Sequence, residues 1–364
     1  MAEAARLAVE WALAANAALL LVTLALLILE AAIAHTPLAR AWGLRRTLNA
    51  TAWALVALLP VLALAPALPE APVNATDLVV AQYLKGNLAL SASELSALID
   101  LRGEVAAALM DRAEPLWRLV AGALAAGALL RGAHVAVTAL RLRGLLSRAR
   151  VLRRAPGLRV LASPEVDVPF ATRGLRRRYV VLPAALLGTP ALRIALAHEM
   201  QHLRQGDATV EVALSLVSPL FALNPAFWAL ARRTRRLREH GCDAACVARP
   251  GIDARAYALC LLDVARATRG GARQGSFSVP FLGRRQIGPG RSQLAQRIEA
   301  LCARPAAARP GIAALLAVAL VAAAAGGTWT LRAPGSWSHE RLMLSSVTNL
   351  ERLRARDTAR TPVW

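Results

Sequence analysis

The segment Ala197-His198-Glu199-Met200-Gln201-His202 contains the pattern HExxH and is the most informative stretch of this 364-residue chain. Positions i and i+4 of a helix lie on one face, so the imidazoles of His198 and His202 can converge on one metal ion. Glu199 lies beside them, where it can accept a proton from the attacking water. Because the chain has only six histidines, a chance match is uncommon. The pattern therefore predicts a catalytic metal site.

Helix signals flank the pattern on both sides. Thr189 is expected to be the N-cap with Pro190 at the first helical position, and Gly206 is expected to end the helix. The apolar residues in between are spaced to form one buried stripe. Its members are Leu192, Ala195, Leu196 and Leu203.

A catalytic zinc ion requires three protein ligands and one open position. The candidates for the third ligand are Glu239, His240, Asp243, Asp207 and Glu211. We favour Glu239, because a carboxylate on a second helix can bind the metal while Asp243, on the next turn, accepts a histidine N–H. His240 is the competing ligand.

Asn224-Pro225 predicts the start of this second helix, which is expected to run to about Val247. Arginines cluster on it, and we favour contact with anionic lipid headgroups over a solvated face or an acidic substrate. No direct contact with nucleic acid is expected, because the cluster lacks interleaved aromatic residues and a DNA-binding motif. The arginines are Arg232, Arg233, Arg235, Arg236 and Arg238.

The residues before the HExxH helix have a different character. Residues 158–161 and 179–182 are short β-prone runs, which predict a small sheet. An exposed edge of such a sheet can hold an extended substrate as an added strand. The apolar residues 208–223 are expected to form a buried or interfacial helix.

Hydrophobic residues make up 56% of the chain and concentrate in four runs of about the length that crosses a bilayer. Arg118 and Arg131 interrupt the third run, and we expect both to lie near its ends and snorkel. The alternative for this run is an amphipathic helix on the membrane surface. The runs are Trp11–Leu29, Asn49–Pro69, Leu116–Leu140 and Pro310–Leu331.

Charge predicts the orientation of these spans. Residues 141–309 hold 29 arginines against 10 acidic residues, whereas residues 69–114 are acidic. Positive segments stay in the cytoplasm, so the metal site is expected there and the N-terminus outside, in a bacterial inner membrane. The expected organisation begins with spans 1 and 2 and their basic loop (1–68), followed by an external loop (69–114) and span 3 (115–140). The metal domain (141–309), span 4 (310–331) and a short external tail (332–364) come next.

The four cysteines, Cys242, Cys246, Cys260 and Cys302, all fall in the segment expected in the cytoplasm, so no disulfide is expected. Cys242 and Cys246 lie four residues apart. We favour small buried side chains over metal ligation for this pair.

These motifs together resemble the BlaR/MecR-type antirepressor membrane metallopeptidases. The resemblance is carried by residues 198–207, Asn224-Pro225 through Trp228, and Glu239 to Asp243. Further matches are Gly174, residues 180–183, Tyr257-Ala258, Leu294, Arg297 and Ile298. It implies a mainly α membrane protein in which a cytoplasmic α+β, zincin-like domain lies between the third and fourth of four transmembrane helices.

The resemblance also implies a gluzincin-like site. His198, His202 and Glu239 would bind one zinc ion per chain, Glu199 would act as general base, and Asp207 and Asp243 would support the ligands. The implied activity is cleavage of a transcriptional repressor in transmembrane signalling, after self-cleavage that we expect within the mobile loop at 270–292. A homodimer is left open.

One departure from the family pattern limits the inference. The β-lactam sensors end in a penicillin-binding domain with a Ser-x-x-Lys motif, whereas the single lysine here is Lys85, so we expect no such sensor. Two alternatives remain. The first is a quality-control protease, because the spacing of Glu239 and Asp243 also resembles that of HtpX-type membrane proteases. The second is a non-catalytic signal relay whose metal site is structural.

Overall fold

The computed structural model describes residues 2–64, 115–270, 293–302 and 309–330, with isolated positions between 79 and 96 and between 343 and 349. The chain forms two compact units. The first comprises Met1–Ala31, Ala50–Ala123 and Ala314–Trp364, and the second comprises Ala32–Asn49 and Leu124–Ala313. The predicted mobile loop at 270–292, apart from its first residue, and most of the predicted external segments lie outside the described residues.

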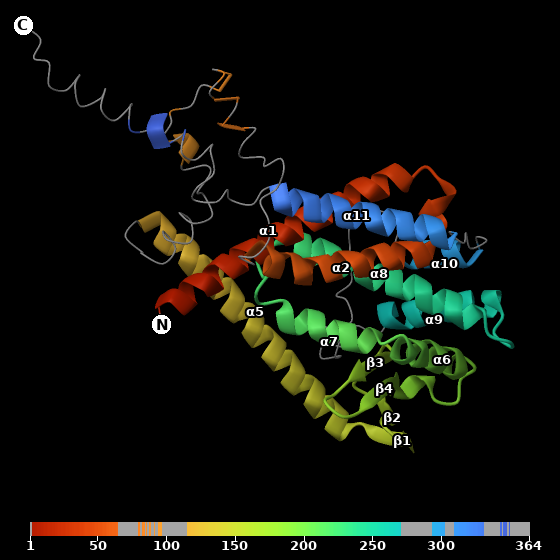
Figure 1. Ribbon diagram of the computed structural model, residues 1–364. Helices are drawn as coiled ribbons and strands as arrows, with labels where there is room; N and C mark the ends of the chain where they lie inside the picture. The colour runs from red at the N-terminus through yellow and green to blue at the C-terminus, as the bar shows by residue number, and fades with distance from the viewer. Residues whose placement is uncertain are drawn as a thin grey trace, which may run out of the picture. The chain divides into compact units, whose positions relative to one another are not determined.

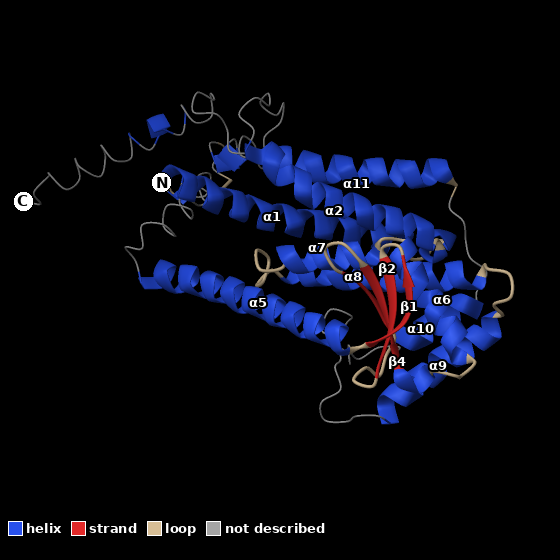
Figure 2. Cartoon of the chain, turned by 90° about the horizontal axis from the view of Figure 1, so that it is seen from below, coloured by secondary structure: helices blue, strands red, loops and turns tan. Residues whose placement is uncertain are grey.

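The first unit is built from long apolar helices. It contains most of α1 (Ala2–Ile33), α2 (Trp42–Leu64) and α11 (Pro310–Thr330), which run side by side in both views (Figures 1 and 2). Among the described residues, Trp11–Ile33 and Arg118–Arg148 are long and apolar enough to cross a membrane, and Pro310–Gly326 is a shorter apolar helix. The arrangement with four spans therefore stays a prediction.

Helix α5 (Pro115–Arg148) corrects the expected place of Arg131. The helix extends well beyond the expected end at Leu140, so Arg131 lies in its middle rather than near an end. Its Nε donates to Ser218 Oγ at 2.7 Å, and its guanidinium lies 4.9 Å from the ring centre of Trp228. Arg131, Ser218 and Trp228 all belong to the second unit, so a hydroxyl and an aromatic face within this unit satisfy the cation, which is an alternative to snorkelling.

The second unit contains the predicted small sheet, with two strands more than expected. The strands are β1 (Arg150–Ala155), β2 (Leu158–Ser163), β3 (Phe170–Arg173) and β4 (Arg178–Pro183). Their order is β1-β2-β4-β3; β2 and β4 are parallel and the outer pairs are antiparallel. The turn between β1 and β2 requires Gly157, whose φ of 70° is costly for other residues.

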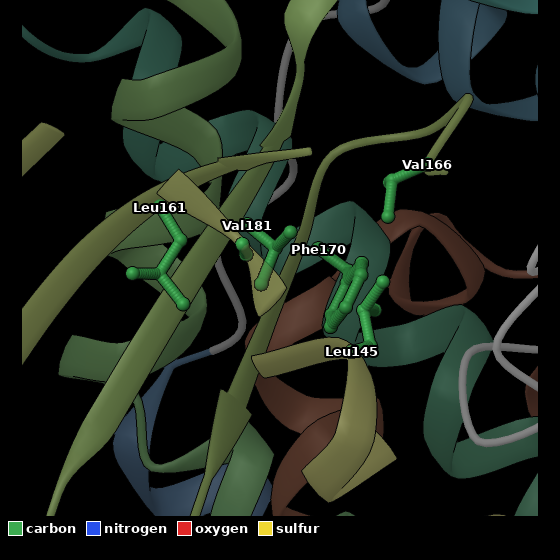
Figure 3. Packing of buried hydrophobic residues seen from close by; sticks show 6 residues of the cluster. Leu145, Leu161, Val166, Phe170 and Val181 are labelled. Carbon is green, nitrogen blue, oxygen red and sulfur yellow. The ribbon is translucent and has the colours of Figure 1, made fainter. Parts of the chain in front are cut away.

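Alternating residues of the strands cover the two faces of the sheet. On one face Leu161, Phe170 and Val181 pack around Leu145 near the end of α5 (Figure 3). On the other face Val160, Val180 and Leu182 pack against Leu203. Leu203 belongs to the predicted HExxH helix, α6 (Ala191–Arg204). The sheet therefore packs against the apolar stripe of α6 that the sequence predicted.

The start of α6 differs from the prediction, and its end agrees with it. The hydroxyl of Thr189 donates to the carbonyl of Leu186 at 2.8 Å instead of capping the helix, and Pro190 occupies the N-cap position. The preceding 3-10 turn, η2 (Ala184–Leu186), supplies this carbonyl. Gly206 adopts a left-handed φ of 76° and ends the helix as expected.

Helices α7 (Asp207–Val217), α8 (Pro225–Val247) and α9 (Ala254–Gly270) of the second unit pack against α6, and α10 (Gln293–Cys302) packs against α8 and α9. Helix α7 is shorter than the predicted 208–223, because Pro219 has no N–H to continue the helical hydrogen bonds. Helix α8 has the predicted bounds, and the side chain of Asn224 caps it by accepting from Ala226 N at 3.0 Å. The unit also contains η1 (Pro37–Arg40).

Candidate metal centre

Helices α6 and α8 bring two imidazoles and one carboxylate together. The Nε2 atoms of His198 and His202 lie 3.1 Å apart. Each is 3.6 Å from an oxygen of Glu239, Oε2 for His198 and Oε1 for His202. The three ligand atoms all lie within 4.8 Å of one another. The structure thus brings Glu239, the favoured third ligand, to the two histidines.

The geometry of this cluster fits a zinc ion. Ligands at about 2.0–2.1 Å from a tetrahedral ion lie about 3.3 Å from one another. Here the two Nε2 atoms are 3.1 Å apart and each lies 3.6 Å from its own Glu239 oxygen, with one ligand atom from each residue within 4.8 Å of the others. Two imidazoles and one carboxylate are also a donor set that catalytic zinc uses, and three protein ligands leave one position for water or substrate. Glu199, buried on the same helix, follows His198 directly.

The Nδ1 atom of each histidine faces a support on the side away from the cluster. With Nε2 directed at a metal, Nδ1 of His198 carries the proton and donates to the Tyr257 hydroxyl at 2.7 Å. That hydroxyl donates in turn to Asp243 Oδ1 at 2.7 Å. Nδ1 of His202 lies 2.9 Å from Asp207 Oδ2. Asp243 therefore reaches His198 through Tyr257, a relay that sequence reasoning did not foresee.

Arg297, on α10, connects two carboxylates of the site. Its Nη1 lies 2.9 Å from Glu239 Oε2, and its Nη2 and Nε donate to the two oxygens of Asp243 at 2.6 and 2.7 Å. The Asp243 side chain is only 3% exposed, so this pair is largely withdrawn from water. The sequence marked Arg297 only as a family match, and nothing local predicted its partners.

These contacts shift the pKa values of the ligands in opposite directions. Burial disfavours the charged imidazole of His198, but Cys246 and Glu239 outweigh it and raise its pKa to about 9. Burial also acts against protonation of His202, yet Asp207 and Cys242 hold its pKa well above the ordinary value. Burial would raise the pKa of Glu239, but Arg297 and His198 lower it well below the usual range. The cluster is therefore a strong site for protons or for a cation.

Cys242 lies on the Nδ1 side of His202 and not on the Nε2 side, where the three proposed ligands meet. Its Sγ lies 3.1 Å from His202 Nδ1 and 3.5 Å from Asp207 Oδ2. Burial raises the pKa of this thiol to about 11, which disfavours the thiolate form that binds metals. Cys242 and Cys246 are both fully buried, as expected for small packing side chains.

His240, the competing ligand, lies outside the cluster. Its ring stacks on Trp42 at the start of α2, with the ring centres 3.9 Å apart. In the same stretch Arg46 Nη1 donates at 2.6 Å to Gln205 Oε1. The segment between the first two predicted spans, expected to be a basic loop, thus packs beside the site. No sequence pattern indicated this contact.

The arginine cluster on α8 is partly used inside the protein. Arg235 and Arg238 bind Glu211 at 2.8 and 2.6 Å, and Arg238 also donates to the backbone carbonyl of Asp207 at 2.7 Å. Glu211, once a candidate ligand, is thereby committed to the two arginines. Arg232 and Arg236 are exposed, and contact of this helix with lipid headgroups stays a prediction.

Comparison with known proteins agrees with this geometry. The family model described as BlaR1 peptidase M56 matches residues 19–301, a range that includes every residue of the cluster and its supports. No curated protein matches the chain.

Proposed function

The chain belongs to the BlaR1 peptidase M56 family, and from this premise we propose that it is a membrane-embedded zinc endopeptidase that cleaves a cytoplasmic or membrane protein. Members of the family are metallopeptidases and membrane proteins. The observation that carries the proposal is the convergence of His198, His202 and Glu239, whose ligand atoms lie close enough together to share one zinc ion.

The residues of the chain take distinct roles in this proposal. His198, His202 and Glu239 hold the ion, which would lower the pKa of a water molecule and polarise the scissile carbonyl. Glu199 accepts the proton of the attacking water and returns it to the leaving amine. Tyr257 and Asp207 keep the imidazole rings oriented through their Nδ1 atoms.

Within this activity we assign a signalling role, the regulated cleavage of a transcriptional repressor. The support is membership of the family, together with the packing of Trp42 and Arg46 beside the site, which connects the segment between two predicted spans to the metal domain. We place this domain on the cytoplasmic side and the N-terminus outside. The proposed self-cleavage in 270–292 concerns residues outside those described, save Gly270.

The test uses the full chain in detergent. The wild type is expected to bind one zinc ion and to cleave peptides, to lose activity with a chelator, and to regain it with zinc. Glu199→Gln is expected to keep the zinc and lose cleavage by about 10³-fold or more, because it removes the proton acceptor alone. If the zinc-loaded wild type cleaves peptides no faster than Glu199→Gln does, the proposal is refuted and a signal relay is favoured.

A second candidate, an HtpX-type quality-control protease, draws on Asp243, which lies one turn after Glu239 and contacts the site through Tyr257. A substrate trap separates the two roles. Glu199→Gln is crosslinked in its native membrane and the captured proteins are identified. One DNA-binding repressor supports the signalling role, whereas many damaged membrane proteins support quality control.

A further inference from the structure

An open pocket lined by arginines lies beside the metal centre. Its volume is about 420 Å³. It is bounded by the turn between β1 and β2, the connection from β3 to β4, and the junction of α6 and α7. The lining residues are Gly157, Arg173, Arg176, Arg177, Arg178, Leu203, Gly206 and Thr209. Four of these eight are arginines and none is acidic.

The charge of this pocket is not neutralised within the described part of the chain. All four arginine side chains are exposed, and no ion pair joins any of them to an acidic residue that the structure describes. Arg173 donates to the hydroxyl of Thr209 at 2.7 Å, which ties the end of β3 to the first turn of α7. Several arginines around one open pocket focus a positive potential and attract an anionic group.

The pocket is coupled in space to the metal centre. Leu203 directly follows His202, and Gly206 directly precedes Asp207, the residue that hydrogen-bonds to His202. The other wall contains the end of β3, an edge strand with a strand partner on one side only among the described strands. An extended segment lying along β3 would end among these arginines, because β3 ends at Arg173.

We propose that the pocket formed by Arg173, Arg176, Arg177 and Arg178 binds an acidic stretch of the polypeptide substrate and thereby places the neighbouring peptide bond at the metal centre. The inference rests on the proposed endopeptidase function. A protein chain is the preferred occupant over a lipid headgroup, because the pocket borders the helix that holds His198 and His202 and lies at the end of the edge strand β3.

The test compares two synthetic peptides on the full chain in zwitterionic nanodiscs. They share one central segment, and one of them carries four flanking Asp or Glu residues where the other carries Ser or Gln. Binding is measured by fluorescence anisotropy on Glu199→Gln, and kcat/KM is measured on the wild type. We expect the acidic peptide to be favoured about three- to tenfold in both, and the preference to weaken with salt.

The test variant is Arg176→Gln with Arg177→Gln, which removes two charges from the pocket. The matched control is Arg153→Gln with Arg154→Gln, which removes two exposed charges from β1 at the other edge of the sheet. The ratio of kcat/KM for acidic over neutral peptide is expected to fall towards one in the first variant and to be kept in the control.

The possible results separate the pocket assignment from the proposed endopeptidase function. Cleavage of both peptides without an acidic preference overturns the pocket assignment and leaves the endopeptidase standing. Preferential binding to Glu199→Gln without any cleavage by zinc-loaded wild type overturns the proposed function and keeps the anion site. If the preference disappears in nanodiscs containing phosphatidylglycerol, the pocket belongs to lipid headgroups and the peptide assignment is wrong; if it persists there, the assignment is supported.

Discussion

Arg297 Nη1 lies 2.9 Å from Oε2 of Glu239, so the carboxylate proposed as the third zinc ligand is shared with a cation from another helix. The same guanidinium holds both oxygens of Asp243. One arginine thereby fixes a ligand and the acceptor at the end of the Tyr257 relay. Arg297 lies on α10, which directly precedes α11, the last predicted span. The site therefore depends on a residue close in sequence to that span.

Replacing Arg297 with Met is expected to destabilise the domain by about 3–5 kcal/mol, because it leaves the buried Asp243 charge without its partner. Thermal unfolding in detergent measures this loss. Arg297→Met combined with Asp243→Asn is expected to recover part of it, since the orphaned charge is gone. Strictly additive effects of the two substitutions would contradict a direct pair.

Tyr257→Phe is expected to lower zinc affinity or kcat/KM by about 10- to 100-fold, because it removes only the hydroxyl between His198 and Asp243. Zinc affinity is measured by competition with a chelator. Tyr179→Phe, the same change on β4, is the control and should match the wild type. An unchanged zinc affinity and kcat/KM in Tyr257→Phe would show that the relay does not orient the imidazole.

Glu239→Ala and His240→Phe separate the two candidate third ligands. The first is expected to abolish stoichiometric zinc, because it removes one of three ligands. The second keeps an aromatic ring against Trp42 and is expected to retain zinc. Metal analysis after dialysis gives the answer, and zinc lost only from His240→Phe would reverse the assignment.

Zinc affinity is expected to fall as the pH is lowered. In the absence of metal the pKa of His198 is raised to about 9 and that of His202 is also raised, so the histidine pair holds excess proton near neutrality that must be released when zinc binds. Below pH 9 the apparent Kd should therefore rise about tenfold per pH unit for each proton released. Isothermal titration between pH 6 and 8 measures this, and a Kd independent of pH would contradict the raised pKa values.

The sequence predicted the parts of the site that depend on local geometry. HExxH on a helix places two imidazoles on one face whatever the fold, and Asn224-Pro225 starts α8 through a cap that lies within a few residues. The cap at Thr189 was wrong by one residue, because its hydroxyl found a competing acceptor at Leu186. Two of the four strands, β2 and β4, were predicted. The sequence did not predict β1, which is rich in arginine, or β3, which has only four residues.

The sequence by itself determined the chemistry available here: two imidazoles one turn apart, a neighbouring glutamate, apolar helices and membership of the family. Only the tertiary structure decided which distant groups complete the site. Tyr257 reaches His198 across 59 positions, and Arg297 reaches Asp243 across 54. Such partners leave no local periodicity or cap, because packing of whole helices brings them together. HExxH thus identifies a site, and packing around it selects Glu239 over His240.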